Sequence, residues 1–170
     1  EVLISSGSIE RPLVFGNNDT PGVMLSSAAK EYLKIYGVLV GKKPLVFTNN
    51  DSGYETAIEF KKNGIDPVIL DTRKDPSSEI VNEAKSLNID IKFSYVVVAA
   101  KGYKKVKSAD IAKISDDKKQ LSQIENINCD CICVSGFWTP TIHLASQSGN
   151  KTKFNEDIDA FIPGQSKQNE

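Results

Sequence analysis

Apolar residues recur every three or four positions between residues 25 and 36, at Leu25, Ala28, Ala29, Tyr32, Leu33 and Tyr36. This spacing predicts an amphipathic helix. Gly37 is suited to end it, because glycine readily adopts the left-handed conformation of a helix C-terminus. The same periodicity predicts helices over residues 53–62 and from about residue 76 to 87. Asp75 is the expected N-cap of the latter, with Pro76 in its first turn.

Continuous apolar runs lie between these helices. Residues 44–48 and 67–71 have the length and the β-favouring composition of buried parallel strands, and residues 129–135 predict a last core strand. Residues 91–100, 101–107 and 109–114 predict a small antiparallel excursion. The alternation of strands and helices predicts an α/β domain, Rossmann-like, with a mainly parallel sheet and helices on both faces.

The composition of the 170 residues is that of a globular chain, with 39% hydrophobic and 25% charged residues and a net charge of −1. It offers no electrostatic footprint for nucleic acid, and no apolar run approaches the roughly 20 residues of a membrane helix. Cys129, Cys131 and Cys133 alternate, so all three are expected on one face of a strand as reduced thiols, which indicates the cytoplasm. No metal site is predicted, and a structural role is favoured for His143.

A turn with dinucleotide-binding geometry follows the first buried strand, at residues 48–53. In G-x-G-x-x-G the three glycines form the turn, admit the pyrophosphate and allow close packing of helix on strand. Here only Gly53 matches the third glycine, while Asn50 crowds the phosphate position and Asp51 adds repelling charge. Asp71 lies 18 residues after Gly53, where a ribose-binding acid is expected. Asn49, Asn50, Gly53 and Asp71 are therefore candidates for a nucleotide site or for its structural remnant, and the remnant is favoured.

Several blocks along the chain carry a family resemblance. They are E-R-P-L-V-F at residues 10–15, N-D-T-P-G-V-M at 18–24, T-N-N-D at 48–51, S-G-F-W-T-P at 135–140 and H-L-A-S-Q-S-G at 143–149. In this order they resemble the α subunit of heterotetrameric sarcosine oxidase, a much longer protein. The chain begins at Glu1 in an expected strand, so we interpret it as a fragment of such a subunit.

The resemblance implies a domain plan. Residues 1–22 would be the edge of a first FAD/NAD-type domain with its linker, and residues 23–135 an inserted domain like the NAD(P) domain of pyridine nucleotide-disulfide oxidoreductases. Residues 136–170 would return to the first domain and end in a polar tail. Trp138, in an expected loop, would stack on a ligand or partner, or fill a domain interface.

The resemblance also implies NAD in the α subunit, FAD in the β subunit and FMN between them, with the other oxidase subunits as partners. Sarcosine oxidation would occur on the β-subunit flavin, so no catalytic residue is expected here. Ser6, Gly7 and Arg11 would contact NAD in the intact subunit. The fragment would be an inactive accessory domain. The alternatives are an NAD(P)H-binding reductase domain that delivers electrons to a flavin, and the α subunit of a related proline dehydrogenase or opine oxidase.

Overall fold

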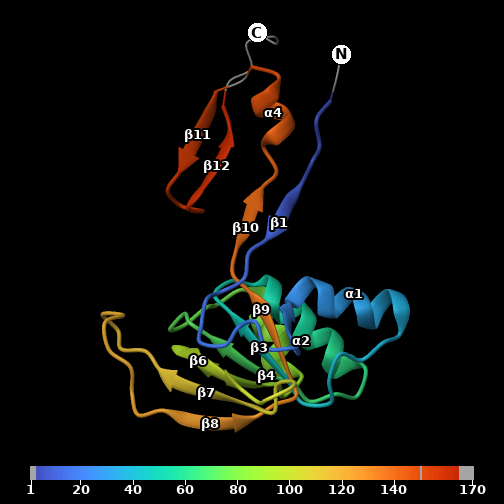
Figure 1. Cartoon of the computed structure of the whole chain (residues 1–170), viewed down its shortest axis with the longest axis vertical. Coiled ribbons are helices and arrows are strands. Elements are labelled where there is room, and N and C mark those ends of the chain that lie inside the picture. Colours follow the sequence, from blue (N-terminus) through green and yellow to red (C-terminus); the bar gives the residue numbers. More distant parts are fainter. Residues whose placement is uncertain (1–2, 150, 165–170) are drawn as a thin grey trace. The chain divides into compact units, whose positions relative to one another are not determined.

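The computed structural model describes residues 3–149 and 151–164. These residues form two compact units (Figure 1). The core unit comprises residues 12–136, and the terminal unit comprises the described residues before and after it. None of the helices in the described ranges has the length and apolar character needed to cross a membrane.

A five-stranded parallel sheet forms the centre of the core unit. Its strands, in spatial order, are β2 (Val23–Leu25), β9 (Cys131–Ser135), β3 (Pro44–Thr48), β4 (Val68–Asp71) and β5 (Asp90–Phe93). Every residue of β3 and β9 is buried, because both faces of the sheet are covered. The runs predicted as buried parallel strands are thus confirmed.

The helices of the core unit pack on one face of this sheet. They are α1 (Ser26–Tyr36), α2 (Ser52–Lys62) and α3 (Glu79–Ser86). Their apolar sides form one cluster with Val46, Ile69 and Cys133 of the strands. As predicted, α1 ends at Gly37, whose φ of 63° is left-handed. The predicted start of α3 at Asp75 is wrong, since the helix begins after Ser78.

The opposite face is covered by a three-stranded antiparallel sheet. Its strands are β6 (Tyr95–Lys101), β7 (Ser108–Lys113) and β8 (Glu125–Asn128). Val97, Ile111 and Leu70 meet in a second apolar cluster there. The α/β fold class is therefore confirmed, but the expectation of helices on both faces is not met. The predicted strand at residues 101–107 is mostly the connection between β6 and β7.

The three cysteines are buried, and no disulfide joins them. Cys131 and Cys133 belong to the helix-side cluster, whereas Cys129 belongs to the cluster beneath the antiparallel sheet. The prediction that all three share one face is wrong, because β9 begins only at Cys131 and the alternation does not extend back to Cys129.

The terminal unit contains two strand pairs and one short helix. Here β1 (Ser8–Glu10) pairs antiparallel with β10 (Trp138–Pro140), α4 (His143–Gln147) follows, and β11 (Thr152–Asn155) pairs with β12 (Ala160–Pro163). The segment around Trp138, predicted as a loop, is thus a strand. Residues 3–7 have no regular structure, and the rest of the strand expected near Glu1 lies outside the described residues.

Candidate functional site

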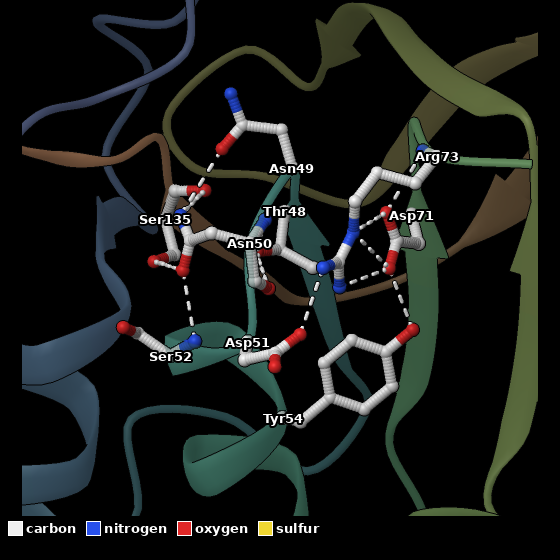
Figure 2. Close-up of polar contacts among 9 residues, drawn as sticks. All are labelled: Thr48, Asn49, Asn50, Asp51, Ser52, Tyr54, Asp71, Arg73 and Ser135. Carbon is white, nitrogen blue, oxygen red and sulfur yellow. Dashed lines mark hydrogen bonds and ion pairs between the residues drawn. The ribbon is translucent and has the colours of Figure 1, made fainter. Parts of the chain in front are cut away.

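The candidate turn lies at the carboxyl end of the parallel sheet. It connects the carboxyl end of β3 to the start of α2, and β3 is flanked by β4 on one side and β9 on the other. Ligands of open parallel sheets bind outside the carboxyl ends of the strands, where chain connections diverge. Figure 2 shows the polar side chains that gather there.

Asn50 occupies the N-terminus of α2 with its own side chain. Its Oδ1 accepts a hydrogen bond from the backbone N–H of Ser52 at 2.8 Å, and its Nδ2 donates to the carbonyl of Ser135 at 3.2 Å. The N–H of Asn49 donates to the same carbonyl at 3.3 Å. Because a bound phosphate uses the N–H groups at a helix start, Asn50 fills its place. The two bonds to the Ser135 carbonyl join the turn to the end of β9 (Figure 2).

Gly53 fulfils the packing role of a third glycine. A Cβ at this position would lie 2.6 Å from Cβ and 2.8 Å from Oγ1 of Thr48, which is itself fully buried. Thr48 Oγ1 donates to the carbonyl of Asn50 at 2.8 Å and accepts from its N–H at 3.1 Å. The close helix–strand contact of a nucleotide fold is therefore retained, while Thr48 and Asn50 replace the other two glycines.

Asp71 ends β4 and is completely buried. Its carboxylate accepts hydrogen bonds from the Tyr54 hydroxyl at 2.7 Å, from the backbone N–H of Arg73 at 2.9 Å and from Nη2 of Arg73 at 2.8 Å (Figure 2). A ribose hydroxyl would have to displace one of these donors. Burial, followed by the bond to Asp71, raises the pKa of Tyr54 well above its usual value.

Arg73 connects the turn to the end of β4. Its Nη1 forms an ion pair with Asp51 at 2.8 Å, so the guanidinium joins Asp51 to Asp71. Burial alone would lower the pKa of Arg73, but the hydrogen bonds to both carboxylates raise it above its usual value. Sequence reasoning treated Asp51 as an unpaired charge and missed Arg73. The available signal was an arginine two residues after the strand-ending acid.

The remaining predicted site residues belong to the terminal unit. Ser6 Oγ donates to the carbonyl of Thr141 at 2.6 Å, and Gly7 has a φ of 66°. The Arg11 guanidinium donates to the carbonyls of Ile158 and Asp159, each at 3.3 Å. The structure thus assembles Asn49, Asn50, Gly53 and Asp71 in one unit and holds Ser6, Gly7 and Arg11 in the other.

No cluster of three or more potential metal ligands occurs among the described residues. His143 is the first residue of α4. Trp138 is about one-third exposed and lies in β10.

Comparison with known proteins shows which proteins the chain is similar to. It is 35% identical over 166 residues to the sarcosine oxidase subunit alpha of Rhizobium meliloti (strain 1021), covering 96% of this chain and 16% of the relative. It is 32% identical to the subunit alpha of Corynebacterium sp. (strain P-1), covering 96% of this chain and 17% of the relative. The chain is homologous to one segment of sarcosine oxidase alpha subunits. It spans about one-sixth of their length, and no family model matches it.

Solved structures show the same fold at low sequence identity. Thioredoxin reductase of T. acidophilum superposes with a TM-score of 0.68 at 17% identity, covering 86% of this chain and 47% of that one. L-proline dehydrogenase of P. horikoshii superposes with a TM-score of 0.58 at 20% identity, covering 95% and 26%. The predicted resemblance to sarcosine oxidase alpha subunits and the predicted fold class are both confirmed.

Proposed function

We propose that the chain is an accessory nucleotide-fold domain of a sarcosine oxidase-like flavoenzyme subunit and performs no catalysis of its own. The parent complex would carry out the oxidative demethylation of sarcosine in the cytoplasm, with NAD in its alpha subunit and FAD and FMN bound elsewhere. The homology along the whole chain to subunits of that name supports the assignment. Partner subunits of the oxidase would then be its binding partners.

One observation carries the accessory role: the side chain of Asn50 accepts the Ser52 N–H at the start of α2. A dinucleotide would need this N–H for its pyrophosphate and a free acid for its ribose. The carboxylate of Asp71 already accepts bonds from Tyr54 and Arg73. Both recognition positions are satisfied by the protein, which supports a structural role for residues 48–53.

The second candidate is an NAD(P)H-binding reductase domain, and Arg73 is the observation that favours it. An arginine near the end of the second strand of a nucleotide fold can receive a 2′-phosphate. Here the guanidinium is held by Asp51 and Asp71, so the phosphate would have to compete with two carboxylates. A variant of the first candidate, the alpha subunit of a proline dehydrogenase or opine oxidase, has the same domain role.

Calorimetric titration of the purified chain with NAD, NADH, NADPH, FMN and FAD tests the assignment. We expect no binding up to millimolar ligand, which corresponds to less than about 4 kcal/mol of binding free energy. Micromolar binding of any of these ligands would overturn the accessory role. Binding of NADPH alone would support the reductase candidate.

The double variant Asn50→Gly with Asp51→Ala should bind NAD about tenfold more tightly or better. The first change removes the side chain that accepts the Ser52 N–H, and the second removes a carboxylate that would repel the phosphate. The matched control is Asn63→Gly with Asp66→Ala, which makes the same changes near the other end of α2. Equal affinity of both double variants for NAD would show that the turn is no altered phosphate site.

A further inference from the structure

The amino-terminal edge of the parallel sheet, opposite the candidate turn, is built from three segments that hydrogen bonds hold together. The Asp130 carboxylate accepts from the backbone N–H groups of Lys42 and Lys43, each at 2.8 Å. The N–H of Cys129, just before β9, donates to the carbonyl of Lys107, in the connection between β6 and β7, at 3.3 Å. The loops before β3 and β9 and the connection between β6 and β7 are thereby fixed next to one another.

Five exposed lysines are carried by these segments, namely Lys42, Lys43, Lys104, Lys105 and Lys107. Within the described part of the chain, no ion pair joins any of these five lysines to a carboxylate, and Lys34, Lys113 and Lys119 elsewhere are unpaired as well. The nearby Asp130 is engaged by backbone amides. In a chain of net charge −1 this edge concentrates unpaired positive charge.

A depression of about 470 Å³ lies next to these lysines, and its charged lining residues are Lys42, Lys105 and Asp130. Pro21, Leu39 and Val40 contribute apolar surface to it. Its wall is closely packed at Gly41, where a Cβ would lie 2.5 Å from Asp130 Oδ1 and 2.6 Å from Cys131 Sγ. Any bulkier residue at position 41 would have to displace that wall.

An exposed apolar strip leads into this depression from the C-terminal part of α1. Ile35, Tyr36 and Val38 are 66%, 69% and 49% exposed, and Leu39, at 43%, belongs to both strip and depression. The rings of Tyr32 and Tyr36 lie 6.1 Å apart on this side of the helix. Exposed apolar residues next to charged ones, with aromatic side chains among them, are typical of protein interfaces.

We propose that this basic-rimmed apolar surface, formed by residues 32–43, Pro21 and Lys104–Lys107, docks an acidic amphipathic segment of another protein subunit. Apolar side chains of that segment would cover the strip, and its carboxylates would meet the lysines. The lysines supply the charge complementarity, and the shared Leu39 joins apolar and cationic parts into one surface. The proposal deepens the accessory role and rests on it, but it uses no nucleotide chemistry.

Fluorescence anisotropy with the full chain tests this proposal. The probe is a labelled helical peptide of leucine and glutamate with its leucines on one face. A peptide with lysine in place of glutamate, a glutamate homopolymer, and vesicles of phosphatidylcholine and phosphatidylserine in equal parts are the comparison ligands. We expect binding of the leucine–glutamate peptide only, weakened by added salt.

Charge reversal identifies the surface. Lys42→Glu with Lys105→Glu should weaken binding of the leucine–glutamate peptide about tenfold or more, and Tyr36→Ser with Leu39→Ser should do the same. The matched control, Lys113→Glu with Lys119→Glu, changes the net charge equally on exposed lysines of β7 and the loop after it and should leave binding unchanged.

Equal loss in the Lys113/Lys119 control would overturn the proposal, as would equal binding of the lysine peptide, the glutamate homopolymer or the vesicles. The nucleotide titration is independent of these results. Binding of NAD at the turn would refute the accessory role. The peptide result could still be interpreted, because the turn follows β3 whereas Lys42 and Lys43 precede this strand.

Discussion

At the carboxyl end of the parallel sheet polar side chains pair with one another, whereas at the amino end five lysines have no carboxylate partner among the residues that the structure describes. Asn50 completes the start of α2, and Arg73 joins two carboxylates. Nucleotide folds normally keep their unsatisfied groups at the carboxyl end, where ligands bind. This difference shows that a nucleotide-type fold can keep its strands and helix packing while its unpaired charged groups lie at the amino end of the sheet and not at the carboxyl end.

Removing the cation at the carboxyl end should have the largest effect. Arg73→Met leaves the fully buried Asp71 with fewer donors, and because Arg73 is itself partly exposed we expect a loss of about 2–3 kcal/mol in unfolding free energy. Urea denaturation measures it. Lys74→Met breaks an exposed ion pair with Asp116 and should leave the midpoint unchanged. Equal midpoints for both variants would refute the structural role of Arg73.

The contact between Gly53 and Thr48 should have the next largest effect. A methyl group at position 53 meets fully buried atoms at 2.6 Å, so Gly53→Ala should lower the unfolding free energy by about 2 kcal/mol despite the helix preference of alanine. Gly37→Ala is the comparison: its φ is left-handed but the space around it is open, so we expect about 1 kcal/mol. A smaller loss at Gly53 than at Gly37 would contradict close packing at the turn.

At neutral pH the smallest effect is expected at the amino end, and it grows only as the pH rises. Burial, and secondarily the charges of Cys131 and Asp130, raises the pKa of Cys129 to about 12. In the unfolded chain the Cys129 thiol loses its proton at a lower pH than in the folded chain. Its contribution to the unfolding free energy is therefore intact below about pH 9. That contribution is lost as the pH rises toward about 12, by up to about 1.4 kcal/mol per pH unit.

Urea midpoints between these pH values should therefore fall less steeply for Cys129→Ala than for the parent chain. The acidic side provides an internal control, because below about pH 8 the offset between parent and variant should stay constant. Parallel curves throughout the alkaline range would show that the Cys129 thiol does not titrate differently in the folded chain.

The core strands β3, β4 and β9 and the three helices of the core unit could be predicted from sequence, because buried parallel strands are continuous apolar runs and amphipathic helices have a clear period. The spatial order of the strands, with β9 between β2 and β3, was not predicted. The antiparallel layer could not be assigned to a face, since alternation in β6 and β7 does not show which sheet they cover. Cys129 was assigned to the wrong face of the sheet because side chains alternate between faces only within a strand, and β9 begins at Cys131. At the turn, the obstruction by Asn50 was predictable from residue type. The pairing of Arg73 with Asp51 and Asp71 was not, because it requires the ends of two strands to be neighbours.

The hydrogen bond from the Arg11 N–H to the Phe137 carbonyl, 2.9 Å long, joins the residues that flank the core unit on either side. The polypeptide therefore enters and leaves residues 12–136 at the same place, at the end of the antiparallel strand pair β1 and β10. A segment whose ends meet in this way can be accommodated in a host chain at the cost of a short loop closure, whatever its own length. We therefore expect that residues 12–136 can be removed or replaced without changing the path of the chain on either side.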